Sequence, residues 1–133
     1  EARARFAAPT PRLAEAAWLA AHGATAMIDI SDGVVSEAAH LAAAGRVGIM
    51  LHLDRLPCVP TASMHDAAMS GEEYELLVTA PASVDAAAFA ARFGLALTAI
   101  GEVGAVDAAA PAVRTLVRGS AVEVPRGHDH LSA

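Results

Sequence analysis

The feature that most constrains this chain is a short apolar segment that ends in a polar turn and passes directly into helical spacing. Residues 24–30 are apolar and partly β-branched, as in a buried strand, and Ser31, Asp32 and Gly33 follow. Over residues 34–44 the apolar side chains recur with the period of an amphipathic helix. This order predicts a strand, a polar turn and a helix, with the polar groups gathered where the strand leaves its sheet.

The remaining segments keep alternating between the two periods. Helices are predicted over residues 10–23, 34–44, 62–69 and 84–93, and about five strands over residues 24–30, 47–53, 74–79, 97–103 and 113–118, with a last extended piece at 122–124. Thr10 and Pro11 are expected to start the first helix, and Gly45 to cap the second. The apolar face of the first helix is expected to carry Leu13, Ala17 and Ala20. This mixed order favours an α+β fold with helices packed on a mixed β-sheet.

Composition narrows the classes of function. The 133 residues suit a single domain, and the net charge of -6 without a Lys/Arg cluster argues against nucleic acid or an anionic membrane as partner. An acidic excess suits metal ions instead. The single Cys58 indicates a reducing compartment, so a cytoplasmic protein is expected. The sequence also contains no apolar run of the ~18 to 20 residues that a membrane span requires.

The turn between the first strand and the second helix offers two carboxylates, a hydroxyl and a glycine. A helix N-terminus presents unpaired N–H groups to phosphate, Gly33 allows close backbone approach, and the carboxyl groups of Asp29 and Asp32 are the hard ligands that Mg²⁺ prefers. The other interpretation is that Ser31 or Asp32 only caps the helix, while Asp29 lies exposed at the strand end. The spacing alone leaves both open.

Two further polar segments are present. Glu72, Glu73 and Glu75 lead into the strand predicted over residues 74–79, where they either bind a cation or form a solvated strand edge. The pair His128 and His130 has the form of a transition-metal ligand pair, but no further ligand is near in sequence, which favours a terminal tail.

Four segments together resemble the C-terminal half of thiamine-monophosphate kinases, within the aminoimidazole ribonucleotide synthetase-related superfamily. They are Met-Ile-Asp-Ile-Ser-Asp-Gly at 27–33, Gly-Glu-Glu-Tyr-Glu-Leu at 71–76, Ile-Gly-Glu-Val at 100–103 and Gly-His-Asp-His at 127–130. Within the superfamily, Ile-Ser-Asp-Gly is typical of the kinases. The resemblance implies that residues 1–133 form the C-terminal domain, and that an N-terminal domain absent from this chain dimerises and supplies most of the ATP site.

The resemblance also implies roles for individual residues in phosphoryl transfer from ATP to thiamine monophosphate. By motif position Asp29 and Asp32 would ligate Mg²⁺, Ser31 and Gly33 would contact ATP, and Glu72 and Leu131 would contact the thiamine phosphate. The sequence departs from the family pattern at Ser70, Glu73 and Leu131. Those departures leave open a paralogue with another phosphoryl acceptor, a non-catalytic nucleotide-binding or regulatory module, and a structural dimerisation domain.

Overall fold

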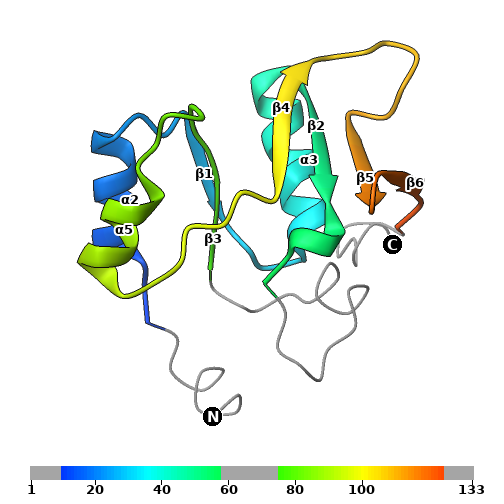
Figure 1. Cartoon of the computed structure of the whole chain (residues 1–133). Helices are drawn as coiled ribbons and strands as arrows, with labels where there is room; N and C mark the ends of the chain where they lie inside the picture. Colours follow the sequence, from blue (N-terminus) through cyan, green and yellow to red (C-terminus); the bar gives the residue numbers. More distant parts are fainter. Residues whose placement is uncertain (1–9, 58–74, 125–133) are drawn as a thin grey trace.

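The computed structural model describes residues 10–57 and 75–124 and has an α+β architecture (Figure 1). The elements of these residues are α2 (Leu13–Ala21), β1 (Ala26–Asp29), α3 (Val34–Gly45), β2 (Val47–His52), the 3-10 helix η1 (Leu53–Arg55), β3 (Leu76–Thr79), α5 (Ala86–Phe93), β4 (Gly101–Ala105), β5 (Val113–Val117) and β6 (Ser120–Val122). The predicted fold class is therefore confirmed. The helix predicted over residues 62–69 lies outside the described residues.

The strands form two sheets rather than the single sheet expected. Strands β1 and β3 pair antiparallel, with Asp29 opposite Leu76. The other sheet has the order β4-β2-β5-β6, in which β2 and β5 run parallel and the other neighbours antiparallel. Strand pairing over long sequence separations is not encoded in local periodicity, so the sequence pattern gave the strands but not this division.

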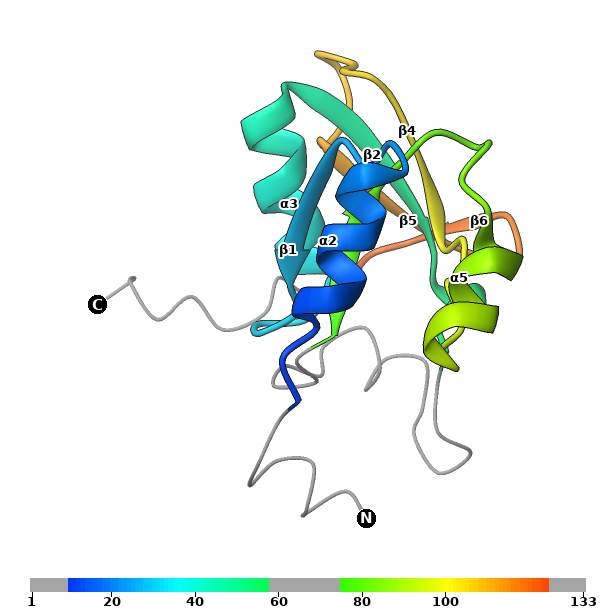
Figure 2. The ribbon, with the colours of Figure 1, turned by 90° about the vertical axis from the view of Figure 1, so that its left-hand side faces the viewer.

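Helix α3 holds the two sheets together. It contacts β1 and β3 of one sheet and β2 and β5 of the other, and the two views show it beside both sheets (Figures 1 and 2). The buried core is built from its apolar stripe and from the strands that face it, and comprises Ile30, Val34, Val35, Ala38, Ala42, Ile49, Leu51, Leu53 and Leu77. The first turn of α3, which contains Val34 and Val35, is consequently part of this core.

Helix α2 buries a different face from the one predicted. Leu13 is 76% exposed, and Ala17 and Ala20 are exposed as well, whereas Leu19 is only 1% exposed. Trp18 packs edge-on against Phe89 of α5, with ring centroids 5.6 Å apart. An alanine-rich helix offers apolar residues on every face, so the large side chains of residues 18 and 19 decide which face is buried.

The element ends also differ in places from expectation. Helix α2 begins after Arg12 as N-cap, not at Thr10 or Pro11. Gly45 is the last residue of α3, and Arg46 adopts the left-handed conformation expected of the glycine, with φ of 52°. Gly94 caps α5 as the helix–glycine pattern predicts, with φ of 66°.

Within the described ranges, none of the helices has the length and apolarity needed to cross a bilayer.

Candidate functional site

The turn between β1 and α3 takes its shape from Gly33. This residue is buried, serves as the N-cap of α3 and has φ of 102° and ψ of 149°, a backbone region close to one that is essentially restricted to glycine. Its carbonyl accepts a hydrogen bond from the N–H of Glu37 at 3.1 Å, which begins the helix. Gly33 therefore has a conformational role in the turn, whatever its contact with a ligand.

The capping interpretation of Ser31 and Asp32 is wrong. Gly33 is the N-cap of α3, and among the described hydrogen bonds neither the Ser31 nor the Asp32 side chain accepts an N–H of the first turn. The polar groups of the turn bond instead to Glu37, one turn into the helix: the Ser31 hydroxyl donates to Oε1 at 3.1 Å, and the Asp32 N–H donates to the same oxygen at 3.1 Å. In this conformation the Ser31 hydroxyl donates its proton to Glu37. Its oxygen lone pairs remain available to a ligand, but it has no further proton to donate.

Asp29 and Asp32 are the carboxyl groups left for a ligand. Asp29 is exposed at the end of β1, and Asp32 is half-buried in the turn. Within residues 10–57 and 75–124, no cluster of three or more His, Cys, Asp or Glu side chains is arranged to hold a metal. Mg²⁺ commonly takes only one or two carboxylates and completes its octahedron with water and phosphate. The pair fits such a partial site, in which a polyphosphate supplies further ligands.

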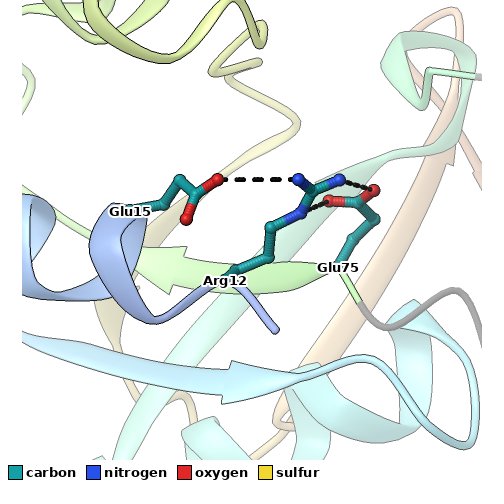
Figure 3. A network of polar contacts seen from close by, with 3 residues as sticks. All are labelled: Arg12, Glu15 and Glu75. Carbon is teal, nitrogen blue, oxygen red and sulfur yellow. Dashed lines mark hydrogen bonds and ion pairs between the residues drawn. The ribbon is translucent and has the colours of Figure 1, made fainter. Parts of the chain in front are cut away.

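Glu75 is the described member of the acidic segment, and it is occupied by an ion pair. The guanidinium of Arg12 donates from Nε to Oε2 at 3.2 Å and from Nη2 to Oε1 at 2.9 Å (Figure 3). Glu15 approaches Nη1 at 3.5 Å from the other side. These carboxyl groups, and foremost the hydrogen bonds to Glu75, raise the pKa of Arg12 above its ordinary value. Glu75 is therefore neither a free cation ligand nor part of a bare strand edge.

The Arg12–Glu75 pair lies beside the turn. The N–H of Ile30 donates to the carbonyl of Glu75 at 2.9 Å, so the backbone of Glu75 adjoins the strand end that carries Asp29. A hollow of about 260 Å³ opens at this point and is lined by Thr10, Pro11, Arg12, Leu13, Ala16, Asp29 and Leu76. Another hollow, over β2 and β4, contains none of the predicted site residues. Space for a ligand therefore exists next to Asp29.

The structure brings Asp29, Ser31, Asp32 and Gly33 together on one turn, as the sequence predicts. Glu72 and Leu131 lie outside the described residues, so their roles stay predictions. Sequence reasoning missed Glu37 and Arg12. A glutamate four residues after the glycine was a usable signal for Glu37, because a side chain in the first turn of a helix can reach back to the preceding loop. No local signal pointed to Arg12, whose partner is 63 residues away.

The fold and the turn define an α+β domain in which a Ser-Asp-Gly turn joins a short strand to the central helix. The family profile described as AIR synthase related protein, C-terminal domain, matches residues 3–113. The chain belongs to this family. A comparison with curated protein sequences finds no match.

Solved structures extend the comparison. AaThiL complexed with AMPPCP and TMP is 29% identical, with a TM-score of 0.68 over 96% of this chain and 40% of that one. Thiamine-monophosphate kinase from Stenotrophomonas maltophilia K279a is 31% identical, with a TM-score of 0.67 over 86% of this chain and 37% of that one. T. maritima PurL complexed with ATP is 25% identical, with a TM-score of 0.59 over 76% of this chain and 17% of that one.

These matches confirm the resemblance to thiamine-monophosphate kinases and a kinase-like fold of the AIR synthase related family. The chain spans about 40% of the length of the first kinase structure.

Proposed function

We propose that this chain is the C-terminal, substrate-side part of an ATP- and Mg²⁺-dependent kinase that converts thiamine monophosphate to thiamine diphosphate. The observation that carries the proposal is the match of 96% of the chain to AaThiL complexed with AMPPCP and TMP. The PurL structure complexed with ATP supports a nucleotide as co-substrate. Because the chain spans 40% of AaThiL, the complete activity is assigned to a protein that also carries an N-terminal domain, which would form a homodimer.

The chemistry of the turn suits phosphoryl transfer to a phosphate. The acceptor oxygen of thiamine monophosphate is already anionic, so no general base is required, and the main difficulty is bringing two polyanions together. Mg²⁺, when bound, would supply the charge that offsets this repulsion. Residues 29–33 contain two carboxyl groups and no histidine, which suits a reaction that needs charge neutralisation rather than proton transfer.

The residues of the turn divide this work. Asp29 and Asp32 would hold Mg²⁺, and their placement at the end of β1 and in the turn that follows it would orient the ion and its phosphate. Gly33 would let the backbone at the start of α3 approach the ATP phosphates, and Ser31 would contact ATP through its hydroxyl oxygen. Glu72 and Leu131 would contact the thiamine phosphate.

Calorimetric titration of the purified chain tests the proposal. Thiamine monophosphate is titrated with and without Mg²⁺ and ATP, alongside an Asp29→Asn, Asp32→Asn double variant that keeps side-chain size but removes both charges. Saturable binding that loses its Mg²⁺ dependence in the variant is expected. Absence of binding, both in this chain and after fusion to an N-terminal domain of a kinase of this family, would contradict the proposed function.

A further inference from the structure

We infer that Glu37 is a positioning residue for the magnesium and nucleotide site, because it fixes the turn that carries Asp29 and Asp32. The inference rests on the proposed function for the identity of the ligand. The structural basis of the inference does not depend on the proposed function. It lies in the contacts of one buried carboxyl group.

Glu37 has the burial of a core residue although it is ionisable. Only 2% of its surface is exposed, and it lies among the apolar residues of α3, next to Ala38, which is 0% exposed. A buried carboxyl group is costly unless polar partners compensate it. Its partners here are the Ser31 hydroxyl and the Asp32 N–H, both at 3.1 Å from Oε1. The burial of Glu37 is thus tied to one conformation of the turn.

These bonds do not cap the helix. The Asp32 N–H precedes the N-cap Gly33, so it is not one of the unpaired N–H groups at the start of α3. A glutamate used only for capping would bond to the N-cap residue, as in a capping box. Glu37 instead bonds to Ser31 and Asp32, the two residues that precede the N-cap. These residues lie between Asp29 and the helix. Its bonds therefore determine where the Asp32 carboxyl group stands relative to Asp29.

Two substitutions separate the hydrogen bonds from the bulk of the side chain. Glu37→Gln keeps the length and one acceptor oxygen, which can receive both donors. Glu37→Met keeps the length but has only a weakly accepting sulfur. Asp85→Ala is the matched control, because Asp85 also accepts a backbone N–H at a helix start but belongs to α5.

Two readouts are made on the full chain. The first is hydrogen exchange of the Asp32 amide, which is expected to be faster by about tenfold in Glu37→Met and unchanged in Glu37→Gln. The second is the calorimetric dissociation constant for ATP at a fixed Mg²⁺ concentration below saturation. Loss of a residue that orients metal ligands typically weakens metal affinity by about tenfold or more. We expect that weakening in Glu37→Met, and neither change in Glu37→Gln or Asp85→Ala.

The outcomes separate this inference from the proposed function. Unchanged Asp32 exchange in Glu37→Met, or faster exchange with unchanged affinity for ATP and Mg²⁺, would overturn the inference while the function stands. A wild-type chain that binds no ATP with Mg²⁺, alone or with an N-terminal domain, would instead overturn the proposed function, and the role of Glu37 in the site would fall with it.

Discussion

Helices α3 and α5 begin in different ways, although each has an aspartate near its start. At α5 the aspartate is the N-cap itself, and the side chain of Asp85 accepts the N–H of Ala88 at 2.8 Å. At α3 the N-cap is Gly33, and Asp32, one residue earlier, caps nothing. The turn at α3 is held by Glu37 from inside the core, whereas the cap at α5 is exposed.

The difference separates an aspartate with a structural task from aspartates without one. Asp85 satisfies a helix N–H, which is a sufficient reason for an aspartate at that position. Asp29 and Asp32 have no such bond among the described contacts. The buried carboxyl group of Glu37 instead accepts hydrogen bonds from the turn that carries Asp32. A turn stabilised in this way, with two carboxyl groups left over, suits the binding of a cation better than it suits a simple helix start.

The largest expected effect on stability is that of Glu37→Met. It would leave the Asp32 N–H, in a half-buried residue, without its acceptor, which costs about 1 to 3 kcal/mol, whereas the hydroxyl of the exposed Ser31 can bond to water and adds less. We expect a loss of about 2 to 3 kcal/mol in the free energy of unfolding, measured by urea denaturation. Glu37→Gln is the control, and an equal loss in that variant would show that charge or packing matters more than the hydrogen bonds.

Gly33→Ala tests the backbone of the same turn. With φ of 102° and ψ of 149°, a residue with a Cβ is strained, which costs about 2 kcal/mol. Urea denaturation would measure this loss. Gly94→Ala at the end of α5 is the control, because φ is 66° there and a Cβ would meet no atom within 4 Å, so about 1 kcal/mol is expected. A smaller effect at Gly33 than at Gly94 would contradict the strain expected of a Cβ at Gly33.

Asp85→Ala removes a conventional cap. The expected loss is about 1 kcal/mol, measured as a lower midpoint of thermal unfolding, because the Ala88 N–H can turn to water. Asp32→Ala is the informative comparison. Since Asp32 caps nothing, it is expected to cost less than Asp85→Ala, and an equal or larger loss would mean that the Asp32 carboxyl group has a structural role after all.

The smallest effect concerns a third carboxyl group that accepts a backbone N–H. Asp54 accepts from the N–H of Arg118 at 3.1 Å, and this bond lowers the pKa of Asp54 below its ordinary value. Its contribution to stability is present near neutral pH and lost as the pH falls through the lowered pKa. Asp54→Asn should therefore differ from wild type more at about pH 7 than at about pH 3, in thermal unfolding against pH. A difference that grows toward acid pH would contradict this direction.

The order of strands and helices follows from the sequence because periodicity is a local property. The second helix was predicted to within one residue, since its apolar stripe is long and Gly33 marks its start. The buried face of α2 does not follow from the sequence, because alanines on every side of a helix do not show which side is buried. The contacts of Trp18 with α5, which decide it, are tertiary. The strand predicted over residues 97–103 lies instead at Gly101–Ala105, because pairing with β2 sets its limits.

The candidate site shows the same division between local and distant information. Asp29, Ser31, Asp32 and Gly33 are contiguous in sequence, so their grouping could be predicted. The bonds from Ser31 and Asp32 to Glu37 could not, since they depend on the φ of Gly33 and on the burial of the helix that carries Glu37. The ion pair of Arg12 and Glu75 joins residues that are 63 positions apart, so it depends on tertiary structure that a local pattern does not encode.

The most direct test of the central claim is a nuclear magnetic resonance titration of the chain with ATP and Mg²⁺, following backbone amides. If the turn before α3 binds the ligand, the amides of Asp29 to Gly33 shift in a saturable, Mg²⁺-dependent manner while those of Asp85 and Ala88 do not move. Equal shifts at both helix starts, or shifts confined to other parts of the chain, would contradict a specific site at this turn.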